Sequence, residues 1–219
     1  MQLPWSDIDS VFLDMDGTLL DLNFDNQFWL HHVPLRYGQI NGMTKDEAWE
    51  ALAPRFRAVE GTLDWYCLDY WSRELDLDIA LLKEEVDHLI AVHPHVLEFL
   101  DAVRALGKRV VLVTNAHMKS LALKMRKTRL DGHLDAMITS HDLGLAKEAD
   151  GFWDKLNAVE PYDRARTLFC DDSLAVLESA RRGGLKHLVA IRLADSKGEP
   201  RPTGDFDAID DFREIMPPR

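Results

Sequence analysis

Short apolar runs alternate with longer amphipathic segments over most of this chain. The runs, rich in β-branched and aromatic residues, span 11–13, 110–113, 136–138, 167–170 and 187–191. Helical spacing of apolar residues covers 95–106, 117–129, 150–158 and 173–182. Strands that alternate with helices predict an α/β fold with a Rossmann-like, doubly wound parallel sheet. After residue 191 we expect turns and one short helix.

One interval breaks this alternation, because the stretch between the first two apolar runs is too long for a single crossover. Within it, helical spacing spans 24–37, 46–60, 63–75 and 79–91. Thr44 and Glu47 form a capping-box pattern at the start of one of these helices. The sequence therefore predicts an inserted α-helical cap domain over 22–93. The core domain would comprise 1–21 and 94–219, with Pro94 marking the return of the chain.

Composition and charge limit the partners of this protein. The chain has 219 residues, 46% of them hydrophobic, and a formal net charge of −12. Such an acidic chain offers little basic surface for a nucleic-acid polymer or an anionic membrane. It can still bind a small phosphorylated molecule if a cation is recruited locally. We find no apolar run of membrane-spanning length.

Cysteine and histidine usage gives weaker indications. The two cysteines, Cys67 and Cys170, indicate no disulfide framework, which favours a reducing, cytoplasmic location. Cys170 lies inside an apolar run and is expected to be a buried thiol. The nine histidines show no metal-ligand spacing, and we expect His117 to be a structural or surface residue.

The clearest chemical signal is the segment VFLDMDGTLLD at 11–21. An apolar strand ends here in two acids, Asp14 and Asp16, and Gly17 then allows a turn. Two carboxylates at the mouth of a buried strand are costly to place without a purpose. Their spacing indicates a nucleophile and an acid/base that share one loop and act with a metal ion.

Polar residues also follow the later strands. Thr114 and Asn115 come after the second run, and Lys147 lies in the loop after the third. Each signal alone has an ordinary interpretation, as a helix cap or a solvated charge. Asp171 and Asp172 end the fourth run, where a Mg²⁺ site or an acidic helix start would both fit. Because carboxyl ends of parallel strands share one edge of a sheet, all these residues are expected to meet.

These motifs, in this order, resemble those of the haloacid dehalogenase-like hydrolases. The resemblance implies that Asp14 is the nucleophile that takes a phosphoryl group. It implies that Asp16 protonates the leaving oxygen and then activates water, while its backbone carbonyl binds the metal. An acid at position 16 favours phosphate transfer over dehalogenation, because a halide leaves without a proton.

The same resemblance assigns roles to the later motifs. Thr114 and Lys147 match the phosphate-binding residues, with Asn115 assisting. Asp172 matches a direct Mg²⁺ ligand, as does Asp14, and Asp171 matches a second ligand or one that acts through water. The implied chemistry is Mg²⁺-dependent hydrolysis of a phosphomonoester through an aspartyl-phosphate.

Within the superfamily, the sequence resembles the bacterial GMP/IMP nucleotidase branch most. The matching segments are FLDMDGTLLDLNFDNQFW, TLDWYCLDYWSRELDLDI, TNAHMKSLALKM and KEADGFWDKL. Glu148 follows the lysine where phosphoglycolate phosphatase-like sequences normally have proline. The resemblance implies purine nucleoside monophosphates as substrates. A sugar-phosphate or phosphoglycolate phosphatase is the alternative.

Several residues of the insertion are candidates for substrate recognition. The aromatic group comprises Trp65, Tyr66, Tyr70 and Trp71. These rings could stack on a purine base, although packing within the cap is the simpler interpretation. Asn23 and Asp25, with Asn26, could approach a ribose or could cap a helix. Arg55 and Arg57 could hold an anionic substrate or remain solvated.

Two other functional classes use similar residues. A phospho-accepting signalling module also places Asp, Thr, Lys and Mg²⁺ on a parallel sheet. Its phosphorylated Asp follows a later strand, however, and it lacks a long insertion. A non-catalytic binding protein is disfavoured by the complete set of acids. The sequence therefore favours an enzyme.

Overall fold

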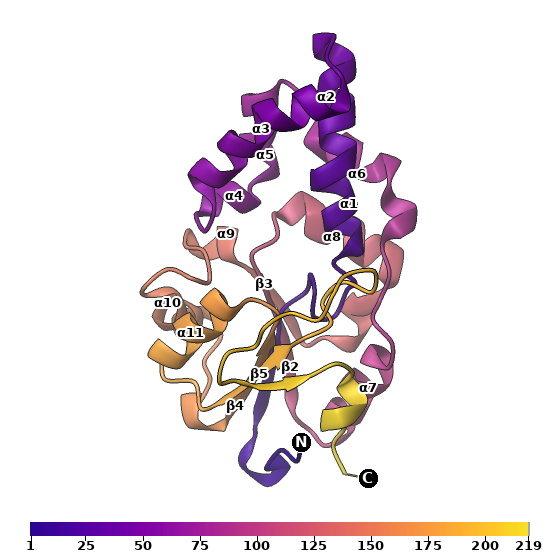
Figure 1. Ribbon diagram of the computed structural model, residues 1–219. Coiled ribbons are helices and arrows are strands. Elements are labelled where there is room, and N and C mark those ends of the chain that lie inside the picture. The colour runs from indigo at the N-terminus through magenta and orange to yellow at the C-terminus, as the bar shows by residue number, and fades with distance from the viewer. Residues whose placement is uncertain (219) are drawn as a thin grey trace.

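The computed structural model describes residues 1–218, which form an α/β core and a helical region above it (Figure 1). The strands of the core are β1 (Ser10–Leu13), β2 (Arg109–Thr114), β3 (Ala136–Thr139), β4 (Thr167–Asp171), β5 (His187–Ile191) and β6 (Asp207–Ile209). They form a parallel sheet with the order β3-β2-β1-β4-β5-β6. The order reverses beside β1, which is where such sheets bind ligands.

The sheet lies between two layers of helices, and alternate side chains of β1 pack against opposite layers. The helices of the core are α7 (Val96–Ala105), α8 (Met118–Thr128), α9 (Ser140–Leu143), α10 (Phe152–Val159) and α11 (Leu174–Arg182). Val11 and Leu13 of β1 pack in the cluster that contains α7 and α8 residues. Phe12, between them, packs with α10 and α11 residues on the other face. Because successive side chains of a strand point to opposite faces of the sheet, both faces of β1 are buried.

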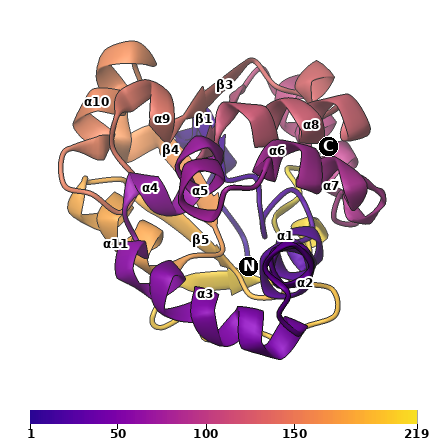
Figure 2. The same cartoon turned by 90° about the horizontal axis from the view of Figure 1, so that it is seen from above.

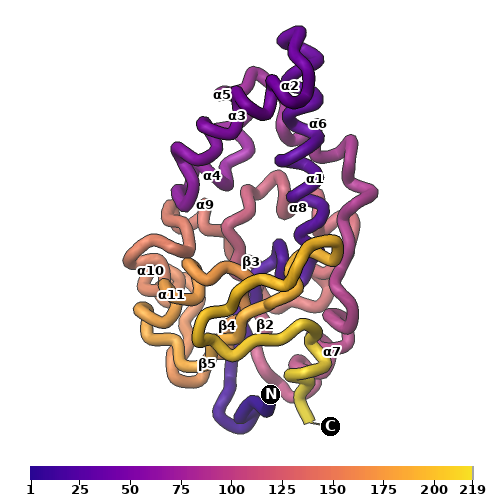
Figure 3. The backbone as a smooth tube through the Cα atoms, viewed as in Figure 1, coloured from indigo at the N-terminus to yellow at the C-terminus, as the bar shows by residue number. Residues whose placement is uncertain are grey.

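The helical region lies between β1 and α7 in the sequence, and we call it the cap. Its helices are α1 (Asn23–Gln27), η2 (Phe28–His32), α2 (Val33–Asn41), α3 (Lys45–Val59), α4 (Leu63–Tyr66), α5 (Leu68–Leu75), α6 (Ile79–Glu85) and η3 (Asp87–Leu89). The chain rises from β1 into the cap and returns to α7 (Figure 3). From above, α1 and α2 are seen nearly end-on (Figure 2). The predicted capping box of Thr44 and Glu47 is present.

Aromatic side chains form the centre of the cap. Phe56 of α3 contacts Trp71 of α5 edge to face, with ring centroids 4.9 Å apart. Trp29 and Trp65 pack against the same pair of rings. The cap therefore has its own apolar cluster, separate from the two clusters of the core.

Several details differ from the sequence-based expectations. The helix expected over 79–91 ends at Glu85 and is followed by the separate short helix η3. The helix expected over 63–75 is broken at Cys67, whose extended backbone (ψ 109°) separates α4 from α5. The helix expected over 24–37 consists of α1, a π-helical turn and α2. The tail contains the short helix η6 (Phe212–Ile215) but also β6, which we did not predict. A three-residue edge strand gives too short a pattern to recognise.

Within residues 1–218, none of the helices combines the length and apolar character that a membrane crossing requires.

Candidate active site

The predicted catalytic residues lie together at the carboxyl ends of the central strands. Asp14 and Asp16 follow β1, Thr114 ends β2, and Asp171 ends β4. They line one cavity of about 530 Å³ whose wall also includes cap side chains. The predicted catalytic, phosphate-binding and metal-binding residues in this wall are Asp14, Asp16, Thr114, Asn115, Lys147, Asp171 and Asp172. The tertiary structure therefore brings together groups that are far apart in the sequence.

Gly17 allows the β1 loop to approach the β4 loop closely. Its φ of +86° lies in the left-handed region, which favours glycine. A Cβ atom at this position would lie 2.6 Å from the carboxylate carbon of Asp172. The glycine of the first motif is thus required both for the turn and for the short distance between two acidic loops.

Lys147 connects the nucleophile candidate with the second acidic loop. Its buried ammonium group donates to Asp14 and, at 2.7 Å, to Asp171. A third bond, of 3.1 Å, goes to the backbone carbonyl of Val113. Burial lowers the pKa of Lys147, but Asp14 and Asp171 raise it more, so the net pKa lies above its usual value. This lysine therefore remains a cation beside the carboxylates.

Three carboxylates form a set that fits a divalent cation. Oxygen atoms of Asp14, Asp171 and Asp172 all lie within 4.8 Å of one another. Burial raises the pKa of Asp14 to about 7, against the opposing effect of Lys147. Burial also raises the pKa of Asp172 well above its usual value, and the neighbouring acids add to this effect. Hard oxygen donors that repel one another suit Mg²⁺, which would stabilise their ionised forms.

Thr114 and Asn115 are both buried, but their contacts differ. The hydroxyl of Thr114 accepts a hydrogen bond of 3.0 Å from the amide of Ala116. The side chain of Asn115 accepts from the backbone N–H of Lys147 at 2.9 Å and donates to Glu148 at 2.9 Å. Asn115 therefore holds the lysine loop in place, a positioning contact that the sequence did not indicate.

A buried chain of charges links Asp16 to the cap. The ammonium group of Lys124, on α8, lies 2.6 Å from oxygens of both Asp16 and Asp25. Asp25, on α1, also accepts a 2.6 Å bond from Lys83 of α6. Lys83 and Lys124 are almost fully buried, and Lys83 lies over the ring of Phe28. Charges buried in this way must be paired to be tolerated.

The balance between burial and these contacts shifts the pKa values of Asp16 and Asp25 in opposite directions. Burial raises the pKa of Asp16 to about 6, although Lys124 opposes the rise. Burial acts in the same direction on Asp25, but Lys124 and Lys83 together outweigh it and hold its pKa at about 2. Asp25 therefore stays ionised, whereas Asp16 can exchange a proton near neutral pH.

Three basic residues that contact the acids of this site were not predicted from the sequence. Lys124 and Lys83 were overlooked, although a lysine inside the apolar runs LALKM and IALLKE is a signal of a buried, paired charge. The third is Arg201, from the segment between β5 and β6, whose guanidinium donates to Asp172. Nothing in the local sequence of Arg201 indicates this contact.

The candidate recognition residues of the cap have different surroundings. Trp65 and Tyr66 line the cavity, as do Asp25 and Asn26, whereas Asn23 lies outside its lining among the described residues. Asp25 is occupied by two lysines, and Asn26 donates to Asp195 at 2.7 Å. The substrate roles of these residues remain predictions.

Arg55 and Arg57 also differ in their positions relative to the cavity. Arg57 lines the cavity, while Arg55 donates at 3.2 Å to the backbone carbonyl of Glu74 within the cap.

Of the predicted aromatic group, Trp71 lines the cavity too, although it is 1% exposed. Tyr70 packs against Trp71, with ring centroids 5.0 Å apart.

Comparison with known proteins shows the family of this chain. A family model described as a haloacid dehalogenase-like hydrolase matches residues 8–184. The chain is 39% identical over 217 residues to the GMP/IMP nucleotidase YrfG of Escherichia coli (strain K12), covering 99% of this chain and 98% of that protein. The match to the protein of the same name from Shigella flexneri has the same values.

Solved structures show the same fold. A HAD phosphatase from Thermococcus onnurineus has a TM-score of 0.78 and 23% identity, with 94% of this chain and 95% of that chain covered. The HAD hydrolase YfnB from Bacillus subtilis, bound to magnesium, has a TM-score of 0.61 and 18% identity, covering 94% and 96%. The matches confirm the predicted fold class and the prediction of an enzyme rather than a signalling or binding module. By the family match and the identity over nearly its whole length, this chain belongs to the haloacid dehalogenase-like hydrolases.

Proposed function

We propose that the protein is a Mg²⁺-dependent phosphomonoesterase that acts on purine nucleoside 5′-monophosphates through an aspartyl-phosphate. The observation that carries this proposal is the meeting of Asp14, Lys147, Asp171 and Asp172 at the core side of one cavity, with aromatic cap residues on its other side. The first group suits a phosphate, and the second suits a flat base.

In the first step, a carboxylate oxygen of Asp14 attacks phosphorus while the ester P–O bond breaks. Asp16 donates its proton to the leaving oxygen, so that an alcohol departs rather than an alkoxide. Lys147 offsets the charge on the phosphoryl group, and the hydroxyl of Thr114 can donate to it. The products of this step are the free nucleoside and a phosphorylated Asp14.

In the second step, water attacks the phosphorus and the bond to Asp14 breaks. Asp16, now a carboxylate, takes a proton from this water, which returns both acids to their starting states. A pKa of about 6 allows Asp16 to act in both directions near neutral pH. Mg²⁺, held by Asp14, Asp172, the carbonyl of Asp16 and Asp171, would neutralise charge on the phosphate oxygens.

The cap supports a purine substrate. The cavity wall includes aromatic residues of the cap that could offer a stacking surface for a base, namely Trp29, Trp49, Phe56, Trp65, Tyr66 and Trp71. It also includes Arg57 and Glu60, a donor and an acceptor. Guanine and hypoxanthine share a carbonyl acceptor next to a ring N–H donor, which this pair can match. Adenine presents the reverse pattern, an amino donor next to a ring-nitrogen acceptor. The relative from Escherichia coli is named a GMP/IMP nucleotidase, and its name supports the proposal of these two substrates.

Two further parts of the proposal concern the whole molecule. We propose that 22–93 acts as a cap domain that closes over a core formed by 1–21 and 94–219. A cytoplasmic location is consistent with Cys67 and Cys170, which form no disulfide within residues 1–218.

The test is phosphate release from a panel of substrates by the purified protein with Mg²⁺. The panel comprises GMP, IMP, AMP, UMP, phosphoglycolate and glucose 6-phosphate. We expect GMP and IMP to give the highest kcat/KM. A panel in which phosphoglycolate or a sugar phosphate exceeds GMP would reject the nucleotidase function and retain the phosphatase. No turnover of any substrate, with Mg²⁺ present, would reject both.

A further inference from the structure

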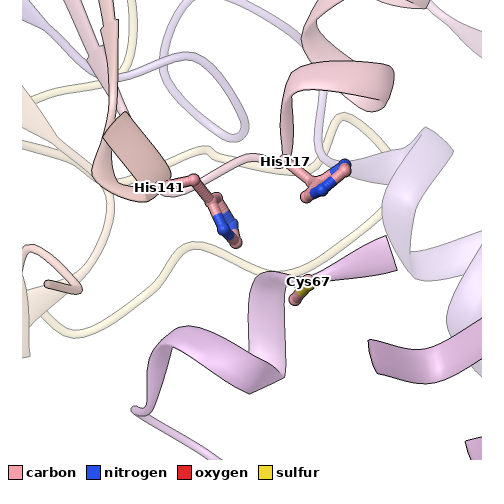
Figure 4. A group of neighbouring side chains, drawn as sticks. All are labelled: Cys67, His117 and His141. Atoms are coloured by element: carbon pink, nitrogen blue, oxygen red, sulfur yellow. The ribbon is translucent and has the colours of Figure 1, made fainter. Parts of the chain in front are cut away.

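A second cluster of possible metal ligands lies apart from the acidic site. It consists of Cys67, His117 and His141, whose ligand atoms all lie within 4.8 Å of one another. The side chains come from three separate segments and face a common space (Figure 4). Cys67 lies between α4 and α5 of the cap, His117 precedes α8, and His141 lies in α9. Sequence spacing gave no sign of this cluster, and we had expected His117 to be structural or a surface residue.

One atom of the cluster has no hydrogen bond. Among the described residues, nothing pairs with the buried Nε2 atom of His141. A buried polar atom without a partner costs free energy, which a ligand at this position would recover. The ring of His141 also lies edge to face against His117, with centroids 5.0 Å apart. The unpaired nitrogen therefore points to an additional group at this site.

The donor types define which ion would fit. A thiolate and two imidazoles favour a borderline-soft ion such as Zn²⁺ over Mg²⁺. Tetrahedral Zn²⁺ needs these atoms about 3.5 Å apart, so side-chain movements of about 1 Å would complete the site. Burial lowers the pKa of both His117 and His141, which keeps the imidazoles neutral and able to bind metal at neutral pH.

A neighbouring carboxylate can support the site. Asp69 of α5 has an oxygen 3.7 Å from Nε2 of His117. Carboxylates near ligating histidines orient the ring or complete the ligand set. Asp69 is held in turn by Lys119 of α8 at 2.6 Å. The ligands and this pair of charges all lie where the cap meets the core.

We propose that Cys67, His117 and His141 form a Zn²⁺ site that joins the cap to the core and restrains the movement of one against the other. Cys67 belongs to the cap, and both histidines belong to the core, so one ion would bridge them. His117 also lines the main cavity, so an ion bound here would lie beside the path of the substrate. This Zn²⁺ site would bind its ion whichever substrate the enzyme hydrolyses.

Binding can be measured without turnover. The protein, stripped with a chelator and held in excess Mg²⁺ to fill the acidic site, is titrated with Zn²⁺ by calorimetry and with Co²⁺ by absorption. We expect one additional equivalent of Zn²⁺ and a thiolate-to-Co²⁺ charge-transfer band. Cys67→Ser should remove the band and weaken Zn²⁺ binding at least tenfold, since loss of a supporting partner alone costs about 10- to 100-fold.

Two further variants make the result specific. His141→Gln should weaken Zn²⁺ binding as Cys67→Ser does, and it serves if the cysteine variant does not fold. His88→Ala, which removes an exposed histidine of η3, should bind Zn²⁺ like the unaltered protein. Equal Zn²⁺ affinity in all four proteins, or a Co²⁺ spectrum without the thiolate band, would overturn the proposal.

The bridging role has its own readout. Zn²⁺ should slow amide hydrogen exchange in 63–75 of the cap at least tenfold in the unaltered protein and leave exchange in Cys67→Ser unchanged. Zn²⁺ that binds through Cys67 without slowing exchange would overturn the bridge between cap and core.

Discussion

The hydroxyl of Tyr66 donates a hydrogen bond to the carboxylate of Glu148, which joins the cap to the lysine loop of the core. Burial raises the pKa of Tyr66, and the charge of Glu148 raises it further, so the phenol stays protonated and remains the donor. Glu148 accepts a second bond from Asn115, which also binds the amide of Lys147. These contacts link the position of α4 in the cap to that of Lys147, the proposed phosphate-binding lysine.

Tyr66→Phe should therefore weaken the closed state. A hydrogen bond to a charged group contributes about 1.5–3 kcal/mol, so we expect kcat/KM to fall at least tenfold. The loss should be similar for GMP and for p-nitrophenyl phosphate, because closure serves both. Trp65→Ala is the matched comparison: it should cost about 1–3 kcal/mol with GMP, as stacking on a base does, and little with p-nitrophenyl phosphate. The opposite pattern for these two variants would contradict the assigned roles.

Asp14→Asn should leave the fold intact and abolish turnover. The carboxylate is the proposed nucleophile, and loss of such a group from a cooperating set costs at least about 10³-fold in kcat. Steady-state kinetics and circular dichroism check activity and folding together. A folded variant with near-normal turnover would exclude Asp14 as the nucleophile.

Asp16→Asn should affect substrates according to their leaving groups. Alkyl phosphates such as GMP need a proton on the leaving oxygen, so their turnover should fall severely. Aryl phosphates need less protonation, and p-nitrophenyl phosphate should lose less. The ratio of the two losses is the measured quantity, and equal losses would argue against an acid/base role.

Removal of the metal should abolish activity. Without a cation, Asp14, Asp171 and Asp172 repel one another in a buried site. EDTA should stop turnover, and Mg²⁺ should restore it. Asp172→Ala should raise the Mg²⁺ concentration needed for half activity more than Asp171→Ala does, because Asp172 is the proposed direct ligand and Asp171 a second ligand or one that acts through water. Full activity in EDTA would show that the acidic set is not a catalytic metal site.

The pairing of Asp25 predicts a pH dependence of stability. Its folded pKa of about 2 lies below the usual 3.8, so its contribution of about 2 kcal/mol is complete above about pH 4. As pH falls toward 2, Asp25 is protonated in the folded state also, and this contribution is lost. Asp25→Asn, which leaves Lys83 and Lys124 without their shared partner, should cost about 3–5 kcal/mol at neutral pH.

Urea unfolding between pH 7 and pH 2.5 measures this effect. The difference between the unaltered protein and Asp25→Asn should be constant down to about pH 4 and should then narrow. Asp131→Asn, at an exposed position, should show no such difference at any pH. A difference that does not change with pH would mean that Asp25 stabilises the fold without its charge.

The sequence alone determined the chemistry at the strand ends. Buried strands require uninterrupted apolar runs, so their positions are visible locally, and a parallel sheet then forces their carboxyl ends to one edge. This is why Asp14, Asp16, Lys147 and Asp172 could be placed near one another before any coordinates. The capping box at Thr44 and the interruption by a helical insertion were visible for the same reason, because short-range patterns encode them.

Contacts between distant segments were decided only by the tertiary structure. The pairing of Lys124 with Asp16 and Asp25, the contact of Arg201 with Asp172, and the meeting of Cys67 with two histidines join residues with no shared local pattern. The edge strand β6 exists because β5 offers it hydrogen bonds, not because three residues encode a strand. Local propensity fixes elements, whereas burial and charge pairing across the cap and core depend on how those elements pack.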